Sequence, residues 1–284
     1  MTLKLQLLTI AVSAALLTGC NKAPEQTANP AAPAAATQAA PATAQTESAK
    51  ANAFFDQYFM DAAALSPMAL TQLGIKQDYD KWDQLTDEQS DKELALTKKA
   101  LADLAQFDVA KLDTQTRLSY QLFKQQLEQD IANDKWRYYN YPVNQMFGMH
   151  SGVPSLLINQ HLIDNEADAK AYIARLNGIT QLFKQLEQQL SKRAELGIIP
   201  PKFVFPLAIA ASQNIIKGAP FSAGADSTIL VDFRNKVNKL TLDDAAKQLL
   251  VKEAEVALTS SVKPAYESLI AYLTAQEKQA GTDD

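Results

Sequence analysis

A continuous apolar stripe between Asn165 and Gly197 constrains the fold of this chain more than any other feature. Its members recur every three or four residues: Ile173, Leu176, Ile179, Phe183, Leu186 and Leu190. This spacing places them on one face of an α-helix. Asp164 or Asn165 can cap its start, and Gly197 followed by Pro200 and Pro201 is typical of a helix exit. The stretch therefore predicts one long amphipathic helix.

Two further helix starts precede this stripe. Thr86 to Gln89 forms a capping box, in which Gln89 can reach back to the first turn. The helix that it begins should run through Leu94, Leu101 and Leu104. Asp113 can cap a second helix, whose apolar positions recur at helical spacing. These positions are Leu118, Leu122, Leu127 and Ile131.

A long C-terminal helix should begin at Asp243 and carry apolar residues as far as Leu273. Between them lie Leu250, Val256 and Leu269. Pro264 should kink this helix, because proline removes one backbone hydrogen bond and clashes with the preceding turn. No stretch alternates with a period of two beside hairpin turn residues. We therefore expect an all-α, multi-helix domain of long antiparallel helices.

The N-terminus reads as a targeting segment. Lys4 precedes a mostly apolar run from Leu5 to Leu17, too short to span a bilayer and typical of a secretory signal. It ends in Leu17-Thr18-Gly19-Cys20, which resembles the lipobox of bacterial lipoproteins. The resemblance implies that residues 1–19 are cleaved and that Cys20 is lipidated. The alternative is a plain signal peptide with an incidental cysteine. Asn21 in place of the usual Asp favours the outer membrane, with the body in the periplasm.

Cys20 is the only cysteine, which excludes internal disulfides, a thiol nucleophile and a thiolate metal site. Residues 20–50 are rich in Ala, Pro, Thr and Gln and predict a disordered tether, since they cannot bury enough apolar surface to fold. Residues 51–284 should form the folded body. The net charge of −5 argues against a nucleic-acid partner, which needs a basic surface.

The only two histidines, His150 and His161, are the natural candidates for a metal site. No glutamate follows either one at the spacing of a zinc peptidase motif. Gly152 and Pro154 fall between them and should interrupt any common helix, so residues 141–161 read as a turn-rich connector. No nucleophile elbow and no phosphate-binding loop occur. The sequence predicts no catalytic and no metal-binding residue.

The aromatic-dense run Trp136–Tyr141 has two interpretations. Aromatic side chains with interleaved polar groups can line a ligand cleft. They can also be half-buried residues at a helix exit. Residues 218–227, GAPFSAGADS, read as a loop rather than a site.

Three ordered stretches carry a family resemblance. The first is Ser66–Ile75 followed by Tyr79-Asp80 and Trp82-Asp83. The second is Asn144-Gln145 with Gly148, and the third is Asp168–Tyr172 with Arg175-Leu176, Gly197-Ile198 and Pro200-Pro201. In these residues and in their order the chain resembles the N-terminal half of the bacterial family DUF885. Members resemble zinc-dependent peptidases and carry a His-Glu-x-x-Pro-Gly-His segment in a C-terminal half, which nothing here matches.

The resemblance implies that residues 51–284 are the non-catalytic helical half of a two-part fold, ended early by truncation, frameshift or gene splitting, or else a short natural relative. Zinc is then expected only with a C-terminal half, which a separate gene can encode. Candidate cleft-lining residues are Tyr139, Tyr141, Asn144, Gln145 and His150.

Two other functions stay open. The chain can be a stand-alone periplasmic binding or scaffold lipoprotein whose aromatic segment binds a peptide or a partner. It can also be an enzyme with an unfamiliar acid/base site. Substrate, ligand and oligomeric state do not follow from the sequence.

Overall fold

The computed structural model describes residues 46–282. These residues form helices joined by loops, and their only β-structure is isolated β-bridges. The all-α prediction is confirmed. The signal segment, Cys20 and the tether up to residue 45 lie outside the described residues. The first helix begins at Glu47 rather than at residue 51, because the hydroxyl of Thr46 caps it by accepting from the Ala49 amide at 3.2 Å.

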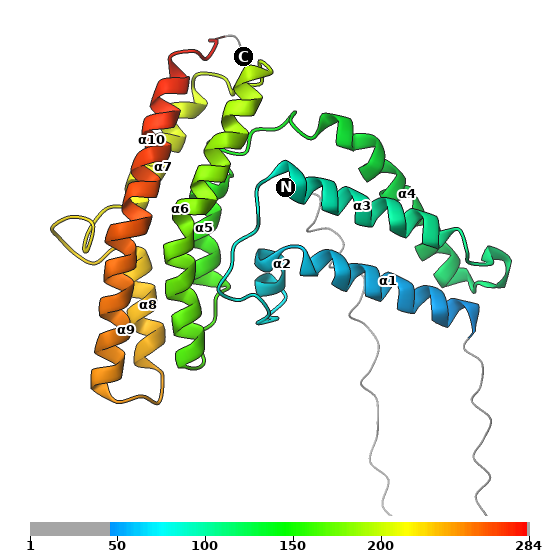
Figure 1. The fold of residues 1–284 in the computed structure, drawn as a ribbon, viewed down its shortest axis with the longest axis horizontal. Coiled ribbons are helices and arrows are strands. Elements are labelled where there is room, and N and C mark those ends of the chain that lie inside the picture. Colours follow the sequence, from blue (N-terminus) through cyan, green and yellow to red (C-terminus); the bar gives the residue numbers. More distant parts are fainter. Residues whose placement is uncertain (1–45, 283–284) are drawn as a thin grey trace, which may run out of the picture. The chain divides into compact units, whose positions relative to one another are not determined.

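The N-terminal helices are α1 (Glu47–Ala64), α2 (Pro67–Gln72), α3 (Asp87–Leu104) and α4 (Thr114–Asn133). Helices α1, α3 and α4 pack on one another around a small core, as Figure 1 shows. Its fully buried members are Ala100, Leu104 and Leu127, surrounded by half-buried aromatic rings of Phe54, Phe55, Tyr58, Phe107, Tyr120 and Phe123. Aromatic edge-to-face contacts thus supply much of the packing of this group.

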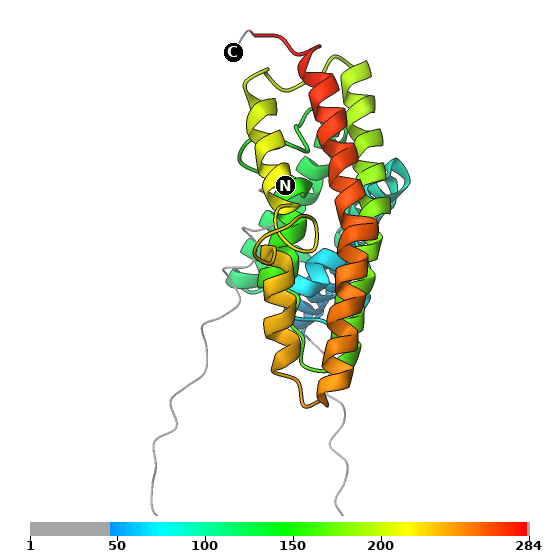
Figure 2. The same cartoon turned by 90° about the vertical axis from the view of Figure 1, so that its left-hand side faces the viewer.

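The remaining helices form the main core. They are α5 (Met149–Asn159), α6 (Glu166–Glu195), α7 (Val204–Ile215), α8 (Thr228–Asn238), α9 (Asp244–Ala257) and α10 (Lys263–Glu277). Helix α6 packs against α9 and α10, α7 packs against α10 and α5, and α8 packs against α9 and α5. Figures 1 and 2 show α6 alongside the rod that α9 and α10 form together.

The predicted stripe on α6 is confirmed, since all six of its members are buried in the main core. Asn165, and not Asp164, is the N-cap, accepting from the Asp168 amide at 3.0 Å. Gly197 closes the helix with a φ of +77°, and the Ile198 amide bonds back to the Arg193 carbonyl at 2.8 Å. The start, the buried face and the end of α6 are therefore all determined by residues within or directly next to this helix.

Two details of the predicted helices are wrong. Gln89 does not complete a capping box, because its side chain donates to the Leu65 carbonyl at 3.0 Å instead. On α4, Leu118 and Leu122 are exposed. The buried face of α4 instead follows Phe123 and Leu127, because these residues meet the aromatic rings of α1.

The predicted C-terminal helix starts at Asp243, which caps α9 by accepting from the Ala246 amide at 2.7 Å. Val256 is exposed, so it does not belong to the core as predicted, whereas Leu250, Leu269 and Leu273 are buried. The irregularity expected at Pro264 takes the form of a π-helical turn, η4 (Leu258–Val262), directly before α10.

The connector predicted for residues 141–161 is confirmed only as far as Gly148. Beyond it the prediction is wrong, because α5 runs through Gly152 and Pro154. Proline removes the amide that would bond to the carbonyl four residues earlier, here that of His150. The hydroxyl of Tyr266 on α10 donates to this carbonyl at 2.7 Å. A residue from another helix thus replaces the missing donor, which a local sequence pattern cannot reveal.

Because the Tyr266 hydroxyl replaces the amide that Pro154 lacks, mutations of these two residues should have coupled effects on stability. Tyr266→Phe should lower the free energy of unfolding by about 1–3 kcal/mol, because it leaves a buried carbonyl without a donor. In a Pro154→Ala background the alanine amide restores the helical bond, so Tyr266→Phe should cost less than half as much. Urea denaturation of the four proteins measures this coupling. Equal costs in both backgrounds would show that the hydroxyl does not replace the proline amide.

Candidate functional site

A buried guanidinium, that of Arg175 on α6, connects α6 to α2 and to the segment after it. It donates to the Lys81 carbonyl at 3.0 Å and to Nδ1 of His161 at 3.1 Å. It also donates to Oγ1 of Thr71 at 2.6 Å and to the Pro67 carbonyl at 3.3 Å. We call Arg175 and these four acceptors the Arg175 network. None of its acceptors is a carboxylate, so neutral dipoles stabilise the buried charge.

Two aromatic rings enclose the same guanidinium. Its carbon lies 5.3 Å from the ring centroid of Tyr79 and 5.2 Å from that of Trp82, within the range of cation–π attraction. The indole of Trp82 donates to the Arg175 carbonyl at 2.7 Å. The pKa of Arg175 falls to about 10, because burial disfavours its charged form. The residue remains a cation at neutral pH.

His161 belongs to this network and has no nitrogen available for a metal ion. Its Nδ1 accepts from Arg175, which places the proton on Nε2, and Nε2 donates to the Asp168 carbonyl at 3.0 Å. Its ring stacks on Tyr79 with centroids 4.0 Å apart. Burial lowers the pKa of His161 to about 3, so the ring is neutral. The first and third DUF885-like stretches therefore meet in this packing network.

His150 is buried beside α10, which contradicts the prediction that it lines a cleft. Burial lowers the pKa of His150 as well, and its Nδ1 has no hydrogen-bond partner. In residues 46–282 no three or more His, Cys, Asp and Glu side chains are grouped so that they could hold a metal ion. The side chains in this part of the chain therefore do not fit a zinc ion, which the resemblance implies only for a C-terminal half.

The aromatic run identified in the sequence is the exit of α4, and it is largely exposed. The short turn η3 (Asp134–Trp136) continues α4, and five large side chains on residues 136–147 face solvent. We call this surface the aromatic ledge; its members are Trp136, Tyr139, Tyr141, Met146 and Phe147. Trp136 and Tyr139 pack edge to face with centroids 4.9 Å apart. The ledge is an apolar surface without a partner among the described residues.

A tight turn presents the far end of the ledge. The amide of Asn144 donates to the Phe147 carbonyl at 2.9 Å. Oδ1 of Asn144 accepts from the amides of Met146 at 2.9 Å and Phe147 at 2.8 Å. Gly148 follows with a φ of +148°, and a Cβ there would lie 2.7 Å from the Pro142 carbonyl, so only glycine fits. The turn is therefore held by its own polar groups while its apolar side chains stay exposed.

Helix α6 supports the near end of the ledge. Arg193 donates to Oδ1 of Asn140 at 3.0 Å and to the Arg137 carbonyl at 3.2 Å. Tyr138 donates to Asp87 at 2.9 Å, and Lys192 pairs with the same carboxylate. These bonds fix the backbone beneath the exposed rings.

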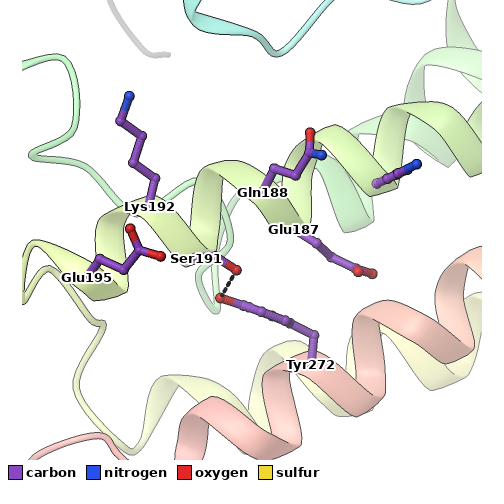
Figure 3. A pocket seen from close by; sticks show the side chains of 7 residues that line it. Glu187, Gln188, Ser191, Lys192, Glu195 and Tyr272 are labelled. Carbon is purple, nitrogen blue, oxygen red and sulfur yellow. Dashed lines mark hydrogen bonds between the residues drawn. The ribbon is translucent and has the colours of Figure 1, made fainter.

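A shallow, polar groove of about 520 Å³ lies along α6 and α10. Figure 3 shows its lining, which comprises Lys184, Glu187, Gln188, Ser191, Lys192, Glu195 and Tyr272. Ser191 donates to the Tyr272 hydroxyl at 3.1 Å, and Gln276 donates to the same oxygen at 2.7 Å. Burial raises the pKa of Tyr272, so the phenol stays protonated, and no imidazole stands beside it to act as a base. The groove therefore shows no activated nucleophile among its lining residues.

The sequence predicts some of the exposed residues of this region but not others. Tyr139, Tyr141 and Gln145 are exposed on or beside the ledge, whereas the Asn144 side chain serves the turn. Met146 and Phe147 were not singled out, although an apolar pair between Asn144 and Gly148 in a turn is a detectable signal. The groove residues follow helical spacing among many other polar residues, which gives no distinguishing signal.

The Asn144 turn predicts a local effect. Asn144→Ala should lower the free energy of unfolding by about 1 kcal/mol, because two amides lose their acceptor. Hydrogen exchange at Met146 and Phe147 should accelerate, while that of the α6 amides stays unchanged. Gln145→Ala, at an exposed neighbour, is the control and should change neither. Unaltered exchange in Asn144→Ala would show that the turn does not depend on this side chain.

No helix in the described part of the chain is long and apolar enough to cross a membrane. The fold and the site together define an all-α protein with a buried cationic network and an exposed apolar ledge. The chain belongs to the family DUF885, described as bacterial protein of unknown function, whose pattern matches residues 67–284. No curated protein matches the chain.

Two solved structures share the fold. One is the "putative lipoprotein from Colwellia psychrerythraea", with a TM-score of 0.71 and 18% identity over 84% of this chain and 43% of that one. The other is a "putative lipoprotein of unknown function from Shewanella oneidensis", with a TM-score of 0.56 and 21% identity over 83% of this chain and 38% of that one. The chain thus spans less than half the length of either structure.

Proposed function

We propose that this chain is the non-catalytic helical half of a two-part, zinc-peptidase-like fold and forms one wall of its substrate cleft. The observation that carries this proposal is the coverage, because 84% of this chain matches only 43% of a solved relative. The aromatic ledge and the adjoining polar groove supply apolar and polar contacts for an extended peptide. Residues 46–282 show no group of side chains that could hold a metal ion to activate water, so the chain alone should not hydrolyse substrate.

Zinc analysis and a peptide assay test this proposal. The purified full chain should contain no stoichiometric zinc and should not cleave a mixed peptide library. Adding zinc to the assay should not change this, because both nitrogens of His161 are engaged and His150 is buried. Stoichiometric zinc together with peptide turnover by this chain would overturn the proposal.

Membrane attachment is the second part of the proposal. Lipidated Cys20 holds the body on the periplasmic side of the outer membrane. Each buried acyl methylene contributes about 0.8 kcal/mol, so several chains on one cysteine anchor it firmly. The wild-type chain should fractionate with outer membranes, and Cys20→Ala should release it. Recovery of the wild-type protein in the inner membrane would contradict the outer-membrane assignment.

A stand-alone binding or scaffold lipoprotein is the second candidate. The observation that favours it is the main core, which is fully formed around α6 within this chain. It predicts a monodisperse protein that unfolds cooperatively and binds a peptide saturably without any second half. Saturable peptide binding that Tyr139→Ala and Tyr141→Ala weaken, in a chain with no complementary partner, would favour this candidate.

A further inference from the structure

Within residues 47–282, two long stretches carry no charged side chain at all. They are residues 138–163 and 203–216, in a chain of which 21% of residues are charged. The first contains α5 and all of the ledge except Trp136, and the second contains α7. These two helices pack against each other, and Figure 2 shows α7 alongside α10. We call α5 and α7 together the α5–α7 layer. Charge is thus missing from one continuous part of the structure.

Helix α7 is mostly apolar on both of its faces, with the exposed, uncharged side chains Gln213 and Asn214 near its C-terminal end. Its inner face enters the core through Val204, Phe205, Ala208 and Ser212. Its outer face exposes Phe203, Pro206, Leu207 and Ala210. A surface helix normally carries polar residues on its outer face. An uncharged outer face with large exposed side chains is typical of a surface that a partner covers.

We propose that the α5–α7 layer is the docking surface for the complementary half of the fold, on the same polypeptide or on a second one. This inference rests on the proposed function and names the surface through which that half binds. The solved relatives contain more than twice the chain that this one matches, and that additional chain needs a large contact surface. Obligate interfaces are apolar and depleted of charge at their centre, as this layer is.

The chemistry of the layer defines the chemistry of its partner. A partner with charged side chains at the centre would lose their hydration without meeting an opposite charge. The occupant is therefore an uncharged, apolar protein surface. An anionic bilayer fits less well, because helices that lie in a membrane interface carry many cations, and only Lys202 and Lys217 flank α7.

Site-specific photo-cross-linking tests the proposal with a matched pair of leucines. Leu207 on α7 is 53% exposed, and Leu249 on α9 is 56% exposed but flanked by Lys247, Lys252 and Glu253. Each is replaced by p-benzoylphenylalanine in the full chain within its own bacterium. Mass spectrometry then identifies the cross-linked species. The probe at position 207, and not the probe at position 249, should cross-link to the complementary half of the DUF885 fold, which residues 67–284 do not contain.

Every other result contradicts the proposal. Cross-links from Leu207 to lipid favour a membrane surface, and cross-links to the same region of a second copy favour a homodimer. Cross-links to an unrelated protein, or none at all, also overturn it. These outcomes leave the proposed function intact, whereas peptide turnover by the chain alone would refute that function and not the docking surface.

A pair of charge substitutions separates docking from folding. Leu207→Lys and Leu249→Lys both change exposed side chains, so each should leave the urea midpoint of the chain unchanged. In cells, Leu207→Lys should reduce the recovered complex by at least tenfold, while Leu249→Lys should leave it within twofold of wild type. Equal recovery with both variants would show that α7 does not contribute to docking.

Discussion

Arg175→Met is expected to lower the free energy of unfolding by about 3–5 kcal/mol. The substitution keeps a long side chain but removes every donor of the Arg175 network. The carbonyls of Pro67 and Lys81, the hydroxyl of Thr71 and Nδ1 of His161 then lose their shared partner. Each buried acceptor left without a donor costs about 1–3 kcal/mol. In urea, the midpoint should fall with little change in the slope.

Two further variants make this result specific. Arg175→Lys keeps the charge but not the planar fork, so it should lose more than half as much stability as Arg175→Met. Lys170→Met on the same helix removes an exposed ion pair with Glu166, whose atoms lie 2.7 Å apart, and should cost less than about 1 kcal/mol. If Arg175→Met proved no worse than Lys170→Met, the network would not be what connects α2 to α6.

Acid is expected to destabilise the protein through His161. The pKa of His161 is about 3 in the fold, against about 6.5 when it is unfolded, because burial disfavours the cation. Between these values the unfolded chain binds the extra proton, so stability is full above pH 6.5 and falls as the pH decreases. One proton changes the free energy by about 1.4 kcal/mol per pH unit. From pH 6.5 to 4.5 the loss should therefore be about 2.5 kcal/mol.

His161→Gln isolates this contribution from the titration of carboxylates. Its amide can accept from Arg175 and donate to the Asp168 carbonyl, but it does not titrate. Unfolding free energies of the two proteins, measured between pH 7.5 and 4.5, should converge as the pH falls. A constant difference across this range would mean that His161 is not held neutral by the fold.

The first prediction concerns a residue by which the chain resembles its family, and the second concerns the histidine that this residue contacts. Tyr79, Trp82, Asp168 and Arg175 come from stretches that are similar to DUF885. In the structure Tyr79 and Trp82 enclose the Arg175 guanidinium, and Asp168 is connected to it through His161. Their geometry gives them a role in packing α2 and the following segment onto α6. The candidate cleft surface lies elsewhere, on the ledge and along the outer side of α6 and α10. A motif that identifies the family thus need not mark a site of chemistry.

The sequence by itself determined the helices whose signals are local. The caps Thr86, Asp113, Asn165 and Asp243 lie within a few residues of the amides that they bond, and the stripe on α6 repeats at the period of the helix. Such signals require no knowledge of the rest of the chain. The family resemblance and the all-α class followed from patterns of the same kind.

Only the tertiary structure decided which faces of these helices are covered. Leu118 and Leu122 have the right spacing for a core, yet α4 turns Phe123 toward the rings of α1. Helix α5 passes through Pro154 because a tyrosine far along the chain replaces the missing donor. The sequence makes His161 a candidate metal ligand, but in the structure Arg175 on α6 donates to one of its two ring nitrogens. In each case the deciding partner is distant in sequence, so the free energy that selects the arrangement arises only when the helices pack.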